Sequence, residues 1–307
     1  MAKISVLLAT YNSAPFVAEL ISSILNQTFS DFELIVSDDA SDDDTVAVVS
    51  SFKDNRIELI KNAVGSGSAQ NNFFKLLLSA KSEYIMFADA DDVWFKQKIE
   101  KTFSRMLEQE ERWGKSTPIL VHSDLTVAGE DLAVIAPSLF KYEKLSPKRT
   151  GLKNLVAQNN VTGCTVMIND ALRKLVKEQP KSSVMHDWWL ALIASAFGKI
   201  SVINEPLMLY RQHGDNQVGA YNASDLLLSA QKLSKKERMK AIYLSMFNQA
   251  ECFAETFRES LTAEQYSVLA EYASFKNKNK LQKIASIVKH GYYKNTLLRN
   301  IGQIFAI

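Results

Sequence analysis

The chain up to about residue 90 alternates between short apolar runs and longer amphipathic stretches. The apolar runs are rich in β-branched and aromatic residues and have the length of buried strands. We expect such strands at residues 4–9, 32–37, 56–60 and 83–88. Apolar positions at helical spacing lie between them, and helices are expected at about residues 12–27, 41–52 and 69–79. Strands that alternate with helices over short connections predict an α/β fold with a parallel, helix-covered sheet.

The alternation is looser in the second part of the chain. A helix is expected at 95–111, and an excursion of strand and loop character at about 125–150. Further strands are predicted at residues 119–122, 165–168 and 200–203, and further helices at residues 169–178 and 187–196. From about residue 225 the pattern is helical to the end. We therefore predict an α/β domain over residues 1–220 and a helical region over residues 221–307.

Three carboxylates directly follow the fourth predicted strand. The apolar run 84–88 ends in Asp89, Asp91 and Asp92, at the end of a strand, where open α/β sheets bind ligands. Asp89 and Asp91 share one side of an extended segment, so they can share Mg²⁺ or Mn²⁺, which prefer oxygen ligands. This interpretation predicts a site for a metal and a diphosphate. The alternative is an acid-rich loop that caps the next helix.

Polar side chains also follow the first two predicted strands. Thr10, Tyr11 and Asn12 can hold a base and a ribose, or form a turn in which Asn12 caps a helix. Asp38 can accept a hydrogen bond from a pyrimidine N3–H, with Asp39 beside it, or both can serve only in helix capping. A parallel sheet places these two strand ends and the acidic one on the same edge. Their coincidence favours a common nucleotide-binding site.

A candidate general base lies in the later helix. Asp187 stands between His186 and two tryptophans, Trp188 and Trp189, at a predicted helix start. Partial desolvation there would raise the pKa of Asp187 toward the value that a general base needs, and the rings could form a wall against a sugar. The alternative is a helix-capping aspartate followed by two core tryptophans.

A polar loop at residues 210–216 contains Arg211 and His213. Together they can hold a diphosphate, and His213 can also bind a metal; an ordinary surface loop is the alternative. The Gly-Ser repeat at 65–68 lacks the spacing of a phosphate-binding loop and is interpreted as a turn. His122 and His290 have no partner pattern and are interpreted as structural.

The overall composition identifies no binding partner. The net charge of +2 does not indicate nucleic acid. Cys164 and Cys252 lack the spacing of metal ligands, which suggests a reducing, cytoplasmic location. We expect neither a signal peptide nor a membrane-spanning segment.

The tail is basic and amphipathic. No acidic residue follows Glu271. Residues 276–307 therefore predict contact with an anionic membrane surface, at the inner face of the plasma membrane, while a helical cap with a solvated basic face is the alternative.

Three segments together resemble the inverting glycosyltransferases of family 2, which have the GT-A fold, a mostly parallel Rossmann-like sheet with flanking helices. The matching segments are residues 6–12, 35–45 and 87–94, and the resemblance spans about residues 3–216. The loop at 210–216 is similar to that of the rhamnosyltransferase-like branch, which builds bacterial surface polysaccharides. That similarity implies a dTDP-L-rhamnose donor and a saccharide or lipid-linked acceptor.

The resemblance also implies a role for each candidate residue. The nucleoside would lie against Thr10, Tyr11, Asn12, Asp38, Asp39 and Asp89. Mg²⁺ or Mn²⁺ would be held by Asp89, Asp91 and His213. Asp187 matches the catalytic base, although the family often has Glu where this chain has His186. The diphosphate or acceptor would contact Arg211, His213 and Trp188.

Two other classes of function compete with glycosyl transfer. A sugar-phosphate nucleotidylyltransferase would need a Gly-rich, Arg-containing loop after the first strand, and residues 9–12 do not form one. A non-catalytic nucleotide- or carbohydrate-binding protein could keep Asp38 and lose Asp187, and this chain has both. The sequence therefore favours the transferase.

Overall fold

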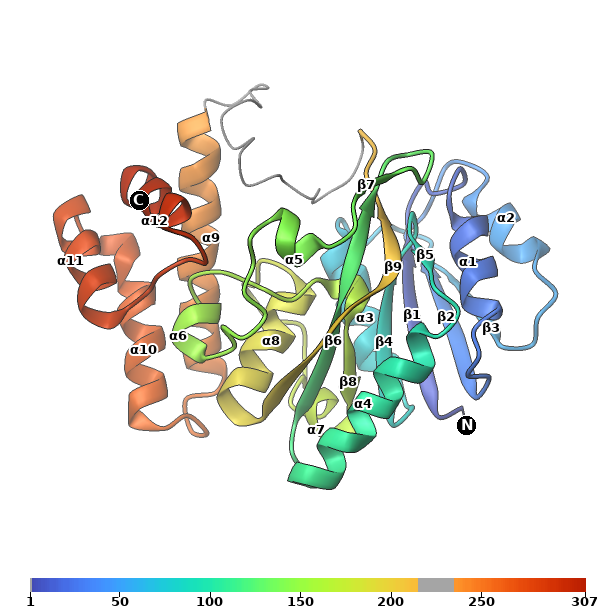
Figure 1. Cartoon of the computed structure of the whole chain (residues 1–307), viewed down its shortest axis with the longest axis horizontal. Helices are drawn as coiled ribbons and strands as arrows, with labels where there is room; N and C mark the ends of the chain where they lie inside the picture. The colour runs from blue at the N-terminus through green and yellow to red at the C-terminus, as the bar shows by residue number, and fades with distance from the viewer. Residues whose placement is uncertain (1, 215–234) are drawn as a thin grey trace. The chain divides into compact units, whose positions relative to one another are not determined.

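The computed structural model describes residues 2–214 and 235–307, which form two compact units (Figure 1). The described part of unit 1 comprises residues 2–139, 161–179 and 197–214. The described part of unit 2 comprises residues 140–160, 180–196 and 235–307. The domain boundary expected at residues 220 and 221 lies outside the described residues.

Unit 1 is built on one sheet with the strand order β3-β2-β1-β4-β8-β6-β9-β5, and β7 pairs with β6. The strands are β1 (Ile4–Thr10), β2 (Phe32–Asp38), β3 (Ile57–Lys61), β4 (Tyr84–Asp89), β5 (Val93–Trp94), β6 (Ile119–Ala128), β7 (Val134–Ala136), β8 (Met167–Asn169) and β9 (Lys199–Arg211). The central strands β1 and β4 are buried along nearly their whole length, as expected for a sheet covered on both faces.

The parallel arrangement predicted for the first four strands is confirmed, because β1 pairs in parallel with both β2 and β4, and β2 with β3. Beyond β4 the sheet is mixed. β8 is antiparallel to both β4 and β6, while β9 is parallel to β6. A strand can return in the opposite direction without a helical crossover, and the excursion after β6 allows this.

The helices of unit 1 are α1 (Val17–Leu25), α2 (Thr45–Ser51), α3 (Ala69–Ser79), α4 (Lys98–Trp113) and α7 (Asp170–Arg173). The helix expected from residue 12 begins later because Asn12 has a left-handed backbone, with φ of 48°. The helix expected over 169–178 is only the short α7. β9 continues well beyond the strand expected at 200–203 and pairs with β5, a strand that the sequence pattern did not indicate.

Unit 2 is helical in its described part. Its helices are α5 (Leu139–Tyr142, whose first residue lies in unit 1), α6 (Leu152–Leu155), α8 (His186–Phe197), α9 (Lys235–Thr256), α10 (Ala263–Ala273), α11 (Lys280–His290) and α12 (Leu297–Ala306). Aromatic rings form much of its core, including Trp189 against Phe253, and Phe247 against Tyr272 and Phe275. Among the described helices, none has the length and apolar character that crossing a bilayer requires.

Candidate functional site

The ends of β1, β2 and β4 bring three of the predicted residues to one edge of the sheet. In the strand register, Thr10 lies opposite Asp38, and Ala9 lies opposite Asp89. The Thr10 hydroxyl donates to Asp38 Oδ1 at 3.0 Å, and both side chains are buried. The expectation that these strand ends share an edge is therefore confirmed.

Asp38 is held in place by the turn that follows it. Its carboxylate accepts hydrogen bonds from the Ser41 amide at 3.0 Å and the Ser41 hydroxyl at 2.6 Å. Asn12 completes the turn: its amide donates to Ser41 Oγ, and its side-chain oxygen accepts from the Asp42 amide. Tyr11 remains 61% exposed. The arrangement fixes the orientation of the Asp38 carboxyl group.

Asp39 fastens a neighbouring turn rather than capping a helix. Its carboxylate accepts from the Ser66 amide at 2.7 Å and from the Ser66 hydroxyl at 2.8 Å. A side chain at Gly65 would bring its Cβ within 3.0 Å of the Asp39 carbonyl oxygen, so glycine allows this close approach. The turn interpretation of 65–68 is confirmed, and the turn lies beside the candidate nucleotide site.

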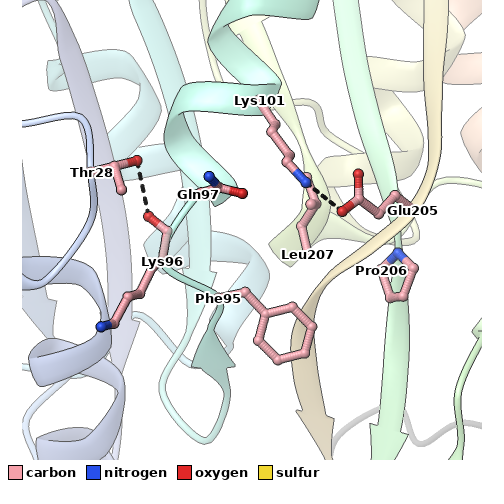
Figure 2. A pocket seen from close by; sticks show the side chains of 8 residues that line it. All are labelled: Thr28, Phe95, Lys96, Gln97, Lys101, Glu205, Pro206 and Leu207. Carbon is pink, nitrogen blue, oxygen red and sulfur yellow. Dashed lines mark hydrogen bonds and ion pairs between the residues drawn. The ribbon is translucent and has the colours of Figure 1, made fainter.

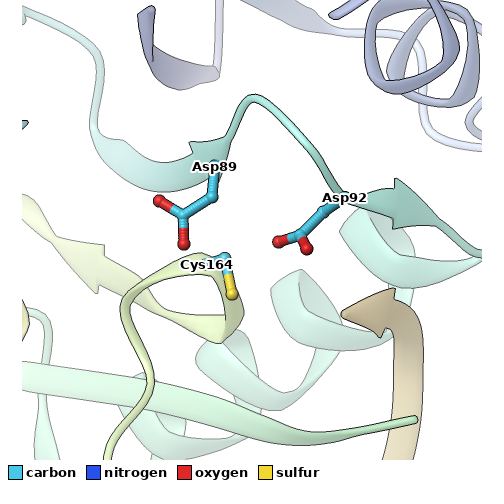
Figure 3. A group of neighbouring side chains, drawn as sticks. All are labelled: Asp89, Asp92 and Cys164. Atoms are coloured by element: carbon cyan, nitrogen blue, oxygen red, sulfur yellow. The ribbon is translucent and has the colours of Figure 1, made fainter. Parts of the chain in front are cut away.

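The acidic cluster contains one partly buried aspartate, Asp91, and one fully buried aspartate, Asp92. Asp91 Oδ2 lies 2.9 Å from His213 Nε2, and both side chains are partly buried. Asp92 is completely buried. Figure 3 shows its carboxyl group turned toward Asp89 and Cys164, whose ligand atoms lie within 4.8 Å of one another and of Asp92.

The electrostatics of Asp92 are those of a crowded, desolvated carboxyl group. Burial raises its pKa well above the ordinary value, and the charges of Asp91 and Asp89 raise it further. One oxygen accepts from the Arg211 amide at 3.3 Å, and the Cys164 thiol also lies next to the carboxyl group. Such a cluster gains stability from nearby positive charge.

One source of positive charge is Lys98, which sequence reasoning missed. The side chain is fully buried, and its ammonium donates to the Cys164 carbonyl oxygen at 2.8 Å and lies 4.6 Å from the centre of the Trp94 ring. Burial lowers the pKa of Lys98 to about 8, against the opposing influence of Cys164, Asp92 and Asp89. One feature could have indicated it: Lys98 lies with Ile99 on the buried side of α4. A lysine in such a position needs a partner for its charge.

Arg211 connects the end of β9 to residues 89–92, which we call the acidic loop. Its guanidinium donates to the Asp91 carbonyl oxygen at 2.7 Å and also bonds the Glu130 carbonyl oxygen and the Glu19 carboxylate. It lies 4.9 Å from the centre of the Phe16 ring. Because Arg211 already has these protein partners, its visible contribution is to hold the loop that carries Asp91.

Carboxylate oxygens at this edge are of the kind that Mg²⁺ and Mn²⁺ accept. Of the predicted metal ligands, the structure sets His213 beside Asp91. Asp89 instead groups with Asp92 and Cys164, which differs from the predicted set. Burial raises the pKa of the Cys164 thiol well above its usual value, so Cys164 is poorly suited to serve as a thiolate ligand.

Asp187 belongs to unit 2 and lies in the first turn of α8. Its Oδ1 accepts from the Trp188 amide at 2.7 Å, and its Oδ2 accepts from the Asn159 side chain at 3.2 Å. The Trp188 ring is buried and its indole N–H donates to the Leu155 carbonyl oxygen, while Trp189 packs in the aromatic core. The rings of both tryptophans are therefore directed into unit 2, and Trp188 contacts the carboxylate through its backbone amide.

The described surface also has two open hollows that none of the candidate residues lines. One, of about 360 Å³, lies between the start of α4 and β9 (Figure 2). The other, of about 540 Å³, includes Tyr84 at the start of β4, the opposite end of that strand from Asp89.

Comparison with known proteins gives a family match. The model of the family described as Glycosyl transferase family 2 matches residues 5–176, more than half of the chain. The chain is 28% identical over 239 residues to the dTDP-rhamnosyl transferase RfbG of Shigella flexneri, covering 69% of this chain and 74% of that protein. It is 33% identical over 144 residues to the UDP-Glc:alpha-D-GlcNAc-diphosphoundecaprenol beta-1,3-glucosyltransferase WfgD of Escherichia coli, covering 46% and 54%.

Solved structures of low sequence identity share the fold. TarS of S. aureus, in complex with UDP-GlcNAc, matches with a TM-score of 0.57 and 17% identity over 98% of this chain and 90% of that one. The mannosyltransferase PcManGT of Pyrobaculum calidifontis, in complex with GDP-Man and Mn²⁺, matches with a TM-score of 0.55 and 14% identity, covering 99% and 79%. The predicted GT-A fold with additional C-terminal helices is confirmed.

Proposed function

The chain belongs to glycosyl transferase family 2, and from this premise we propose that it transfers a sugar from a nucleotide-diphosphate donor to a hydroxyl group of a saccharide or lipid-linked acceptor. The observation that carries the proposal is the strand edge of unit 1. There, Asp38 at the end of β2 is fixed by Thr10 and Ser41. The acidic loop begins at the end of β4, which is separated from β2 in the sheet by β1.

Each part of this edge suits one part of the donor. The buried Asp38 carboxylate accepts the N3–H of a pyrimidine, and the exposed ring of Tyr11 stacks on the base. Asp89 contacts the ribose or the metal, and Asn12 and Asp39 shape the turns on either side. A carboxylate that is already oriented loses little freedom on binding, which favours affinity.

The acidic loop receives the diphosphate. Asp89, Asp91 and His213 would hold Mg²⁺ or Mn²⁺, which when bound stabilises the negative charge of the leaving diphosphate. Arg211 keeps the Asp91 loop at the end of β9 through its bond to the Asp91 carbonyl oxygen. Lys98 supplies a fixed positive charge beneath the carboxylates.

Asp187 takes the part of the general base. It removes the proton of the acceptor hydroxyl, whose oxygen attacks the anomeric carbon while the bond to the nucleotide diphosphate breaks. A single displacement inverts the configuration at that carbon. The Trp188 amide and Asn159 orient the carboxylate for this proton transfer.

The finer assignment is a dTDP-L-rhamnose donor in the synthesis of a bacterial surface polysaccharide. Its support is the 28% identity to RfbG over 69% of the chain, since that relative is named a dTDP-rhamnosyl transferase. A lipid-linked acceptor is supported by WfgD, whose name specifies a diphosphoundecaprenol substrate. An acceptor of this kind supports the proposal that the enzyme works at the inner face of the plasma membrane.

Calorimetric titration of dTDP, UDP and GDP, each with and without Mn²⁺, tests the donor site. We expect dTDP to bind most tightly, and Mn²⁺ to improve its affinity at least about tenfold, or about 1.4 kcal/mol. Asp91→Asn should remove the metal effect, whereas Asp31→Asn, at an exposed acid before the opposite end of β2, should retain it. Equal affinity with and without metal would refute the metal assignment, and failure of all three nucleotides to bind would refute the function.

A further inference from the structure

Helix α12 has an inverted pattern of burial. Its buried residue is the polar Gln303, whose side chain donates to the Tyr292 carbonyl oxygen at 3.2 Å. Its large apolar residues face solvent instead: Leu297, Leu298, Ile301 and Phe305 are all exposed, the first by 77% and the last by 75%. At helical spacing these four positions fall on one face. A surface helix in water normally shows the opposite pattern.

Helix α11 extends this apolar surface. Leu281 and Val288 are exposed by 79% and 60% and lie on one face of α11. Lys280, at the start of α11, donates to the Phe305 carbonyl oxygen at 3.3 Å and lies 5.6 Å from the centre of the Phe305 ring. The start of α11 is therefore adjacent to the end of α12. We call Leu281, Val288, Leu297, Leu298, Ile301 and Phe305 the outer face.

The side of α11 and α12 opposite the outer face packs on other helices of unit 2. The Tyr292 hydroxyl donates to the Val268 carbonyl oxygen at 2.7 Å, and its ring packs on Tyr272 and Phe275. Arg299 forms an ion pair with Glu143 at 3.2 Å. The pair is thus held firmly while the outer face is left without a covering in the described part of the chain.

The charges near the outer face are positive. Lys276 and Lys278 are paired with Glu251 and Glu271, whereas Lys280 and Lys289 are exposed beside the apolar residues. Residues 272–307 contain no acidic side chain. An apolar face flanked by lysines matches a bilayer with anionic headgroups, in which apolar side chains enter the acyl boundary and lysines reach phosphates.

We propose that the outer face of α11 and α12 docks on the surface of a phospholipid bilayer. A second copy fits less well, because a symmetric interface would bring Lys280 and Lys289 of both copies into the same contact, and residues 272–307 contribute no acidic side chain to compensate them. The biological purpose of such docking rests on the proposed lipid-linked acceptor. Its test measures vesicle binding and does not require sugar transfer.

The test is co-sedimentation of the full chain with vesicles of phosphatidylcholine alone and of phosphatidylcholine mixed with phosphatidylglycerol. We expect binding that is tighter on the anionic vesicles. Leu298→Gln combined with Phe305→Gln should weaken binding at least about tenfold on both vesicle types, since each side chain that enters the acyl region is worth about a factor of ten or more. Lys280→Gln with Lys289→Gln should weaken only the anionic binding.

The control is Leu107→Gln, which removes an exposed leucine from α4 in unit 1 and should leave vesicle binding unchanged. The proposal is overturned if the wild type binds neither vesicle, if the outer-face variant binds like the wild type, or if Leu107→Gln has the same effect. Light scattering that shows a wild-type dimer and a monomeric outer-face variant would assign the surface to a second copy. Unchanged dTDP affinity in every variant separates this result from the donor site.

Discussion

Replacing Lys98 with methionine tests whether the buried charge under the acidic loop supports Asp92. Methionine keeps the length and apolar character of the side chain but removes the ammonium. The wild-type ammonium donates to the Cys164 carbonyl oxygen at 2.8 Å, and a charged hydrogen bond of this kind contributes about 1.5–3 kcal/mol. The ring of Trp94, 4.6 Å away, adds a cation–π contact worth about 2 kcal/mol when desolvated.

Burial works in the opposite direction. The pKa of Lys98 falls from 10.5 to about 8, which corresponds to about 3 kcal/mol against the charged form. The gain and the cost of the ammonium therefore nearly cancel. What remains is the coupling of the ammonium to the neighbouring acidic groups Asp92 and Asp89, which raise the pKa of Lys98 against the effect of burial, and removing one partner from a buried charged group typically costs about 3–5 kcal/mol. We expect Lys98→Met to lower the free energy of unfolding by about 3 kcal/mol.

A double-mutant cycle with Asp92→Asn measures the coupling. If Lys98 compensates the Asp92 charge, the double variant should be more stable than the sum of the single effects predicts, by about 1–3 kcal/mol. Urea unfolding followed by fluorescence is suitable, since Trp94 and Trp113 lie in unit 1 and Trp188 and Trp189 in unit 2. Lys96→Met, at an exposed lysine two residues earlier, should change stability by less than about 0.5 kcal/mol. Purely additive single effects would refute the reasoning.

Two further predictions concern the base and a buried histidine. Asp187→Asn should retain dTDP affinity in calorimetry but lose sugar transfer by at least about a hundredfold, and full transfer activity would exclude Asp187 as the base. Burial lowers the pKa of His122 from 6.5 to about 4, so between these values the unfolded chain binds the proton first and stability falls as pH falls. His122→Leu should remove about 3 kcal/mol of the stability difference between pH 7 and pH 4, measured by urea unfolding. Equal acid sensitivity of the His122 variant and the wild type would contradict the assignment.

The shared edge of the strand ends was predictable because it depends on local pattern and one general rule. The strand period places Thr10, Asp38 and Asp89 at strand ends, and a parallel sheet then collects them on one side. The register between β1 and β2 confirms that Thr10 and Asp38 are neighbours. No long-range information was needed beyond the order of the elements.

The support beneath that edge was not predictable, because it joins distant parts of the chain. Lys98 meets the carbonyl oxygen of Cys164, and the Arg211 amide meets Asp92. These contacts arise where the sheet becomes mixed, with β8 antiparallel to β4 and β9 pairing with β5. The hydrophobic pattern does not encode which strand lies beside which, so the partners of buried charges could not be inferred.

The tail shows how structure changes an argument from charge. Its basic and amphipathic pattern predicted contact with an anionic membrane surface, yet Lys276, Lys278 and Arg299 are engaged with acidic side chains from before residue 272. The stronger signal is the apolar outer face, which a net-charge count does not reveal. Membrane contact, if the vesicle test supports it, should therefore depend more on Leu298 and Phe305 than on the total number of lysines.

The division of the chain into two units sets a limit on what each substitution can affect. The groups proposed to bind the nucleotide and metal, including Asp38 and Asp91, are all in unit 1, whereas Asp187 and its partner Asn159 are in unit 2. Asp187 is oriented by the Trp188 amide and Asn159, and Asp38 by Thr10 and Ser41, so neither carboxylate relies on the other unit for these bonds. Donor affinity and proton transfer should consequently be separable by mutation, with changes at Asp38 weakening donor binding and changes at Asn159 slowing transfer.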